Sequence, residues 1–439
     1  MLIFAFFLPF LTWPQAAGCA GLALLFNVFI LPRLGVDLRK RPAPARDEES
    51  QSSALSAAEN VWTGIVIYPV SVLVLILLYR NNMHIVAAAW AIMALGDGMA
   101  SIAGETLRDP ALKWNPGKTW WGLLGFVVAG SAGAYLLTRW SSPSLPVGKA
   151  FVVCVATAVV GAMVESLPIR LDDNLSVPLV SAGFMFCVYL VERSALAGNM
   201  PYLRRRILLG IIVSLLVALL AWRLKTVTRS GAATGYLIGV AVYLGYGYRT
   251  FSILISFFLL GSFATLIGYG TKASRGIAEA GGGARTWREA LANGLAGAFF
   301  SVLIVTTHQE GAFLAAMVAA FAEAAGDTAS SEIGKWLSDR AYLITTFQPV
   351  RAGENGGVTL AGTAAGIVAS GAVVALGYAL GLVGKGGAAL AVGAAFAGNL
   401  LDSLLGATIE RRGLVTNGIV NFAGSSFAGA LALALTLRS

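Results

Sequence analysis

The strongest constraint on the fold is a long series of apolar runs, each close to the roughly 20 residues that a helix needs to cross a bilayer. Hydrophobic residues make up 57% of the chain and charged residues only 12%, unlike a soluble domain. We therefore predict an all-α polytopic membrane protein with about fourteen transmembrane helices. The predicted spans lie near residues 16–32, 62–79, 84–103, 121–138, 148–164, 176–192, 207–222, 230–247, 251–270, 289–306, 312–329, 358–382, 388–407 and 416–436.

A polar break at 221–231, with the sequence AWRLKTVTRSG, divides these spans into two equal sets. We predict two seven-helix halves, a first membrane domain over 1–225 and a second over 226–439. The loop at 35–60 is rich in Pro, Ser and charged residues, which predicts a mobile surface segment.

The formal charge of +9 comes from basic residues in short loops between apolar runs, so no nucleic-acid partner is predicted. If the spans alternate, most basic loops fall on one side, which we expect to be the cytoplasmic face of a cell inner membrane or an equivalent membrane. The arginine-rich segment 191–206 breaks this pattern. Either it forms a re-entrant or interfacial helix, or the first half is miscounted by one span. The three cysteines lack the spacing of a zinc site.

An aspartate interrupts an apolar run in the motif GDGMASIAG at 96–104. A carboxylate in lipid carries a high solvation cost, which favours a functional role. Asp97 and Ser101 share a helical face, because they are four residues apart. Gly96 and Gly98 leave the backbone beside the carboxylate open to a ligand.

The polar segment KWNPGKTWWG at 113–122 follows this motif. Asn115, Gly117, Lys118 and Thr119 offer an amide, a backbone N–H, an ammonium and a hydroxyl, the donors that a polyphosphate needs. The alternative is a Pro-Gly turn at the membrane interface, flanked by a belt of tryptophans. The Gly-Lys-Thr sequence is not a P-loop, because the first glycine is missing at 112 and no strand is expected before it.

A third polar element is VESLPIRLDDNLSVP at 164–178. Glu165, Asp172, Asp173 and Asn174 supply the oxygen ligands that Mg²⁺ prefers. A solvated acidic loop is the alternative interpretation. We favour a metal site because the predicted topology places these residues on the same side as Asp97 and Lys118.

The second half repeats the first motif as GDTASSEIGK at 326–335. Asp327 and Ser331 are four residues apart, like Asp97 and Ser101, and Glu323 falls one turn before Asp327. Thr328 follows Asp327 directly, and Glu332 follows Ser331. The pattern is compatible with an internal duplication. Further candidate ligand contacts in this half are Lys272, Arg275, Arg285, Asn293, Arg351, Asn355, Gly356, Gly357, Asn399, Asp402 and Asn421. The alternatives are positive-inside topology for the basic residues and interhelical hydrogen bonding for the polar ones.

Together, the motifs of the first half resemble the phytol kinase and dolichol kinase family over roughly 60–195. The sequences KASRGIAEAGGGARTWREALANG, GDTASSEIG, ITTFQPVRAGENGGVTLAGT and GNLLDSLLGATIERRG resemble the integral membrane family that includes the plant phytyl-phosphate kinases, over most of 228–436. The chain thus looks like a fusion of two isoprenoid kinases.

This resemblance implies that the first half phosphorylates an isoprenoid alcohol and the second converts the monophosphate to the diphosphate, with CTP or another nucleoside triphosphate and Mg²⁺. It implies that Asp97 and the pair Asp172 and Asp173 bind magnesium, and that Lys118 binds nucleotide phosphates. In the second half it implies metal binding or acceptor activation by Asp327, Glu332 and Asp402. The phosphate contacts there would be Lys272, Arg285 and Arg351.

Two rival functions stay open. A cytidylyltransferase acting on a lipid phosphate needs a similar metal and lysine arrangement but releases pyrophosphate. A transporter also has many spans and intramembrane carboxylates, although it places them near the membrane midplane. Here the polar motifs fall at the ends of spans, which favours the kinase. The expected partners are the isoprenoid alcohol, its monophosphate, the nucleotide and membrane lipids, and a homodimer is compatible with this interpretation.

Overall fold

The computed structural model describes residues 2–34, 64–107 and 110–438, and it is almost entirely helical. The predicted mobile loop at 35–60 lies outside the described residues. The chain forms two compact units, Met1–Tyr189 and Leu190–Ser439. The boundary therefore differs from the predicted 225/226, because the helix α9 (Arg193–Arg223) belongs wholly to the second unit.

The described residues contain 11 helices long and apolar enough to cross a membrane, rather than about fourteen. Three predicted spans account for the difference. The helices at Gly64–Leu78 and α8 (Asp173–Tyr189, 17 residues) are shorter than the roughly 20 residues that a span needs. The helix α10 (Arg229–Tyr246) is long enough, but its arginine, tyrosines and glycines lower its mean hydropathy. The predicted division into two sets of seven spans is not reproduced.

The first unit is built around one long helix whose N-terminal part is buried. Its residues Ile85–Ala91 are all buried, because they are apolar on every side. This helix comprises α4 (Met83–Ala91), a π-helical turn η4 (Ile92–Gly96) and α5 (Asp97–Leu107). The other elements are α1 (Leu2–Phe7), η1 (Leu8–Phe10), α2 (Trp13–Leu25), η2 (Phe26–Ile30), η3 (Leu31–Leu34), Gly64–Leu78, β1 (Ala111–Leu112), β2 (Asn115–Thr119), α6 (Trp120–Ser141), α7 (Val147–Glu165) and α8.

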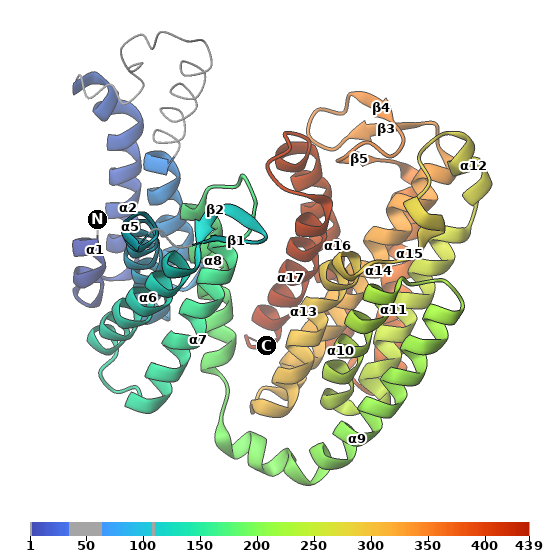
Figure 1. Ribbon diagram of the computed structural model, residues 1–439, viewed down its shortest axis with the longest axis horizontal. Helices are drawn as coiled ribbons and strands as arrows, with labels where there is room; N and C mark the ends of the chain where they lie inside the picture. Colours follow the sequence, from blue (N-terminus) through green and yellow to red (C-terminus); the bar gives the residue numbers. More distant parts are fainter. Residues whose placement is uncertain (1, 35–63, 108–109, 439) are drawn as a thin grey trace. The chain divides into compact units, whose positions relative to one another are not determined.

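The second unit surrounds α14 (Glu310–Leu337), whose most apolar stretch is 89% buried. Its alanine-rich sequence lets five long helices approach closely. The three strands β3 to β5 lie at one end of the bundle (Figure 1). The remaining elements are α9, α10, α11 (Tyr248–Leu266), α12 (Tyr269–Ser274), η5 (Ala280–Gly283), α13 (Trp287–Thr306), β3 (Arg340–Leu343), β4 (Pro349–Arg351), β5 (Gly357–Val358), α15 (Leu360–Ala379), α16 (Lys385–Leu405), η6 (Gly406–Glu410) and α17 (Asn417–Thr436).

The two units repeat the same helix contact. In the first, a Cβ on Gly104 of α5 would lie 3.0 Å from Oγ1 of Thr119. In the second, a Cβ on Gly334 of α14 would lie 2.8 Å from Oγ1 of Thr359. Both glycines let a helix pack tightly against the first turn of the next one. The similarity between the two Gly-Asp motifs therefore extends to the packing of each motif helix.

The same two threonines cap the helices that follow. Thr119 accepts a hydrogen bond from the backbone N–H of Gly122 at 3.1 Å, at the start of α6. Thr359 accepts one from Gly362 at 3.0 Å, at the start of α15. A hydroxyl at this position satisfies one of the free N–H groups of a helix N-terminus. Each unit thus joins a carboxylate-bearing helix to a capped helix through a short β-structure.

The segment 191–206, which broke the expected charge pattern, begins at the isolated bridge between Val191 and Thr307 and continues as the N-terminal part of α9. Its basic residues and the apolar residues that follow thus belong to one helix of 31 residues. Arg206 donates a hydrogen bond to the carbonyl of Leu244 at 3.3 Å, which ties this helix to the end of α10.

Candidate functional site

In the first unit, three carboxylates from three helices come together. Asp97 is the first residue of α5, Glu165 the last of α7 and Asp173 the first of α8. One oxygen from each lies within 4.8 Å of the others, an arrangement that could hold a metal ion. An all-oxygen donor set suits Mg²⁺. The preceding π-helical turn shifts the register of the helix just before Asp97, and such turns are frequent at functional sites.

Lys118 of β2 extends into this acidic cluster. Its ammonium forms an ion pair with Glu165, which is only 3% exposed, and another with Asp173 at 3.4 Å. Burial lowers the pKa of Lys118, but the three carboxylates raise it by more, so the net pKa lies above the usual lysine value. The side chain is therefore a permanent cation within the cluster.

Burial also raises the pKa of Asp173, to about 6, against the opposing effect of Lys118. The carboxylates of Glu165 and Asp97 add to this increase, since like charges disfavour ionisation. A bound cation would relieve this repulsion. The four charged groups thus form one electrostatic unit, which we call the first acidic cluster: Asp97, Lys118, Glu165 and Asp173.

Other predicted residues of the first half have structural contacts instead. The Asn115 amide donates to the carbonyls of Ser166 and Leu167 at 3.2 and 3.3 Å, which anchors the hairpin to the end of α7. Asp172 accepts hydrogen bonds from the backbone and side chain of Asn174 at 2.9 and 2.8 Å, in a local turn before α8. These residues position Lys118 and Asp173 rather than joining the cluster.

The predicted glycines of the first half and Ser101 also lie outside the first acidic cluster. A Cβ on Gly96 would lie 2.8 Å from the ring of Phe126, so this glycine is needed for packing against α6. Gly98 has open space around it, and Ser101 and Gly117 are exposed. The Gly-Lys-Thr sequence lies in β2, which pairs with β1, so it is a strand and not a phosphate loop. The expectation that no strand precedes this sequence was wrong, because β1 precedes it. A P-loop is still excluded, because Gly-Lys-Thr itself lies in a strand.

The second unit contains a cavity of about 610 Å³. Seven carboxylates but only two cations, Arg285 and Lys335, line it. A polyphosphate entering such a site would require metal ions to offset the repulsion. The lining includes twelve residues predicted from the sequence: Arg285, Asn293, Asp327, Thr328, Ser331, Glu332, Asn355, Gly356, Gly357, Asn399, Asp402 and Asn421.

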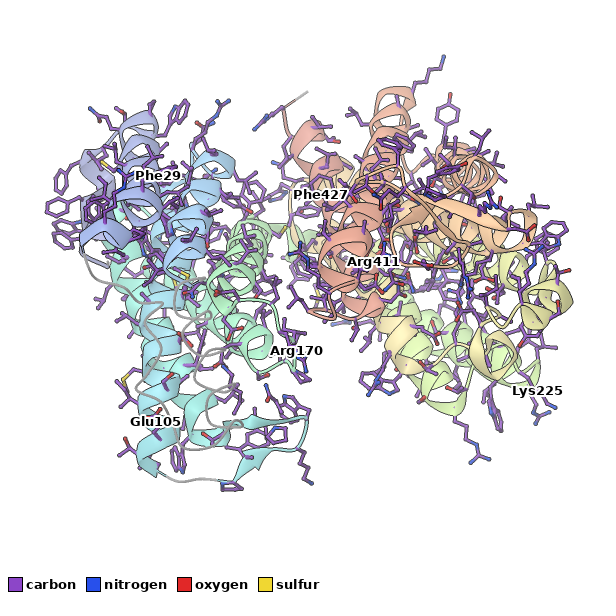
Figure 2. All side chains as sticks on the ribbon, turned by 90° about the horizontal axis from the view of Figure 1, so that it is seen from above. Phe29, Glu105, Arg170, Lys225, Arg411 and Phe427 are labelled. Atoms are coloured by element: carbon purple, nitrogen blue, oxygen red, sulfur yellow. The ribbon has the colours of Figure 1, made fainter. Side chains whose placement is uncertain are left out.

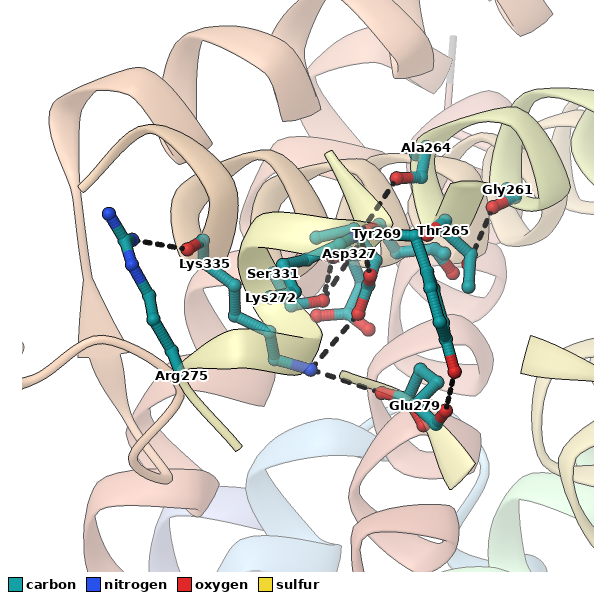
Figure 3. Close-up of polar contacts among 12 residues, drawn as sticks. Gly261, Ala264, Thr265, Tyr269, Lys272, Arg275, Glu279, Asp327, Ser331 and Lys335 are labelled. Carbon is teal, nitrogen blue, oxygen red and sulfur yellow. Dashed lines mark hydrogen bonds and ion pairs between the residues drawn. The ribbon is translucent and has the colours of Figure 1, made fainter. Parts of the chain in front are cut away.

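Lys272, predicted to contact phosphate, does not line this cavity. It is fully buried, lies 2.5 Å from Oε2 of Glu332 and donates to the carbonyl of Thr265 at 2.8 Å (Figure 3). Lys335 reaches the other oxygen of Glu332 at 3.0 Å and also Glu279 at 3.0 Å. Lys272, the predicted phosphate ligand, is thus paired with Glu332 in this structure and does not line the cavity.

Arg275 and Arg351 also lie outside the cavity lining. Arg275 pairs with Asp339 at 2.7 Å and donates to the carbonyl of Lys335 at 3.2 Å, near the end of α14 (Figure 3). Arg351 is exposed on β4. Arg411, labelled in Figure 2, pairs with Glu354 at the cavity rim at 3.4 Å. Cations around the cavity thus pair with three of its seven carboxylates, Glu279, Glu332 and Glu354.

Two side chains that line the cavity, and Glu323, which does not line it, have oxygen atoms without hydrogen-bond partners among the described residues. These atoms are Oδ2 of Asp402, Oδ1 of Asn421 and Oε1 of Glu323. Glu323 is 1% exposed and Asp402 is 9% exposed. Buried oxygens without partners carry a desolvation cost that a cation would remove, so this donor set fits Mg²⁺. The side chain of Asn421 also donates to Asn293 at 3.2 Å, which joins α17 to α13.

The predicted site set did not include Glu279, Glu289, Lys335, Glu354 and Glu410, which also line the cavity. The sequence does indicate that Lys335 lies near the site, because it follows Glu332 by three residues on the same helix. Glu279 and Glu354 lie in loops, where spacing gives no indication of which side chains converge. Glu323, one turn before Asp327 on the same helix, is buried and does not line the cavity.

The family match lies within the second unit. The family described as integral membrane protein DUF92 matches residues 212–431. An uncharacterized membrane protein of Synechocystis is 34% identical over 46% of this chain and 82% of its own length. Protein VTE6 of Arabidopsis thaliana is 32% identical, over 46% of this chain and 63% of its own length. Phytol kinase 1 of the same plant is 32% identical over 28% of this chain and 43% of its own length.

No solved structure matches the chain. The family match and the membrane-spanning helices establish an integral membrane protein, and the relatives include a protein named as a phytol kinase. The match covers half of the chain and contains α10 to α16 with the acidic cavity. The chain belongs to the integral membrane protein DUF92 family.

Proposed function

We propose that this chain is a prenyl-lipid kinase with two active sites. The first unit phosphorylates an isoprenoid alcohol, and the second phosphorylates the resulting monophosphate, with CTP or another nucleoside triphosphate as donor. The observation that carries the proposal is the recurrence of one arrangement. Each unit has an aspartate on the motif helix, Asp97 or Asp327, and a second carboxylate near the end of a later helix, Glu165 or Asp402.

Phosphoryl transfer requires mainly positioning and neutralisation of charge, and both sites offer these. Mg²⁺ held by the first acidic cluster, and by Asp327 and Asp402 in the second unit, would neutralise charge on the transferring phosphoryl group. Lys118 would add a cation beside the donor phosphates. The relationship to a phytol kinase supports a prenyl alcohol as the acceptor, and the motifs resembling phytyl-phosphate kinases support the second step.

In the first step, the oxygen of the alcohol attacks the γ-phosphorus and the bond to the β–γ bridging oxygen breaks. The proton of the alcohol passes to a carboxylate, for which Asp97 is our candidate. The products are the prenyl monophosphate and a nucleoside diphosphate. In the second step, an oxygen of the monophosphate attacks in the same way, and no base is needed because that group is already ionised near neutral pH.

The position of the charged residues favours an enzyme over a carrier. Glu165 ends α7 and Asp173 begins α8, so two of the three carboxylates of the first acidic cluster lie at helix ends, while Asp97 lies within the long helix Met83–Leu107. A carrier places such groups near the membrane midplane. We propose that both sites face the cytoplasm, where nucleotide is available.

The test is incubation of the purified protein with Mg²⁺, γ-labelled CTP or ATP, and a panel of phytol, geranylgeraniol, farnesol and their monophosphates. Labelled diphosphate formed from an alcohol supports both steps in one chain. Label in the monophosphate alone limits activity to the first unit. Release of pyrophosphate with a CMP-linked lipid would instead identify a cytidylyltransferase, and no product with any acceptor would reject the kinase.

A further inference from the structure

A second, apolar cavity of about 90 Å³ lies among α9, α10, α11 and α13. Its walls come from residues such as Val217, Leu254 and Phe258, together with the small residues Ala218 and Gly235. Apart from Ser214 and Arg285, every lining residue is apolar or glycine. Such a cavity favours hydrocarbon over water, because water there would find few hydrogen-bond partners.

Arg285 lines this apolar cavity and also the acidic cavity, so the two spaces share this residue, whose side chain ends in a guanidinium group. The group stacks over Phe257 at 5.1 Å and lies 5.9 Å from the ring of Phe258. A Cβ on Gly261 would lie 2.1 Å from Nη2 of this arginine, so the glycine leaves room for it. The backbone N–H of Arg285 donates to the carbonyl of Thr226 at 3.0 Å, which holds the residue in place.

Among the described residues, no carboxylate forms an ion pair with Arg285. The other cations near the acidic cavity are paired: Lys335 with Glu279 and Glu332, Lys272 with Glu332, and Arg411 with Glu354. Arg285 is therefore available to bind an external anion. Guanidinium groups bind phosphate through two parallel N–H donors, and stacking on aromatic rings leaves these donors free.

We infer that the apolar cavity receives the part of the acceptor tail next to its phosphate, while Arg285 binds that phosphate. The ligand is an isoprenoid monophosphate, the only reactant that carries an anionic group directly attached to a hydrocarbon. This inference rests on the proposed function of the second unit. The nucleotide, which has no apolar tail, would occupy the carboxylate-rich end of the larger cavity.

Gly235 provides a variant that fills the apolar cavity. An added Cβ there has no neighbour within 4 Å, so Gly235→Leu introduces a side chain without a backbone clash. The matched control is Gly371→Leu on α15, which also has open space and lines neither cavity. Both changes replace a helical glycine by leucine, so any general effect on helix stability is shared.

The first measurement is binding, independent of catalysis. The full-length protein is irradiated with a radiolabelled geranylgeranyl monophosphate that carries a photoreactive diazirine near the phosphate, and the labelled peptides are identified. Labelling of α9, α10, α11 or α13 is expected. Gly235→Leu should reduce it at least tenfold, Gly371→Leu should leave it unchanged, and labelling elsewhere in the wild-type protein, or none, overturns the inference.

Arg285→Gln tests the phosphate contact, with Arg288→Gln as control because Arg288 lines neither cavity. Labelling should fall at least tenfold in the first variant and be unchanged in the second.

The kinetic assay then separates the two proposals. Specific labelling without phosphorylation of any monophosphate rejects the proposed function but supports the tail site. If the protein phosphorylates a monophosphate and Gly235→Leu leaves the acceptor KM unchanged, the tail site is rejected and the proposed function stands. The same conclusion follows if Gly235→Leu raises only the nucleotide KM.

Discussion

The ammonium of Lys272 lies 2.5 Å from Oε2 of Glu332, with both side chains buried in the second unit. Lys272 also donates to the carbonyls of Ala264 and Thr265, so α11, α12 and α14 meet at one buried charge. The ammonium of Lys272 stabilises the fold, because without it the buried carboxylate of Glu332 would lose one of its positive partners in a low-dielectric interior.

We expect Lys272→Met to destabilise the second unit by about 3 kcal/mol, since breaking a buried ion pair costs this much. Thermal unfolding in detergent measures the effect. The double variant Lys272→Met with Glu332→Gln should recover part of the loss. If the single variant unfolds like the wild type but has a raised nucleotide KM, Lys272 is the phosphate ligand that the sequence predicted.

Lys118→Met should abolish phosphorylation of the alcohol but leave phosphorylation of an added monophosphate unchanged. The reason is that Lys118 is the cation of the first acidic cluster and forms ion pairs with Glu165 and Asp173. The measurement is a pair of assays on one preparation, with alcohol and with monophosphate as acceptor. Lys113→Met, a change of the same kind in the same hairpin, serves as control. Loss of both activities would contradict separate sites.

Asp97→Asn and Asp327→Asn should each remove one half-reaction and leave the other. We expect the affected rate to fall at least a hundredfold, as removal of a metal ligand or catalytic base does (about 10² to 10⁴). Each variant is assayed with both acceptors. If both variants retain both steps, the two-site mechanism is wrong.

Gly362→Ala should destabilise the second unit by about 1 to 3 kcal/mol through overpacking. A Cβ there would lie 2.4 Å from the carbonyl oxygen of Ser330, which belongs to the backbone of α14 and cannot move aside easily. Gly371→Ala on the same helix, with open space around it, should be neutral or slightly stabilising. Equal melting temperatures for the two variants would show that α14 and α15 do not approach this closely.

Glu279 predicts a pH dependence of stability. Burial raises its pKa, but Lys335 lowers it by more, so the folded pKa lies below the unfolded value of 4.5. The ion pair therefore contributes stability above that value and loses it as the pH falls through the folded pKa. We expect Glu279→Gln to melt below the wild type near neutral pH and the difference to shrink as the solution is acidified. A constant difference at all pH values would contradict this linkage.

The local features of this protein could be predicted from its sequence. Apolar runs determine helices wherever they occur, because backbone groups in lipid must be hydrogen-bonded within the segment. The spacing of Asp327 and Ser331 likewise predicts that both face one side of α14, and both line the acidic cavity. Span counting failed where the outcome depended on exact helix length, as at Gly64–Leu78 and α8.

The pairing of charges was decided only by the tertiary structure. Lys118 meets a glutamate 47 residues away, and Lys272 meets one 60 residues away. Two lysines in polar loops look alike in sequence, yet one enters a cluster of three carboxylates and the other is buried as a counter-ion. Sequence by itself determined which segments are helical and which faces are polar, because those properties depend on neighbours within a few turns. The tertiary structure alone decided which cations remain free for a ligand. The reason is that the carboxylates that pair with the other cations lie on distant segments, which only packing brings together.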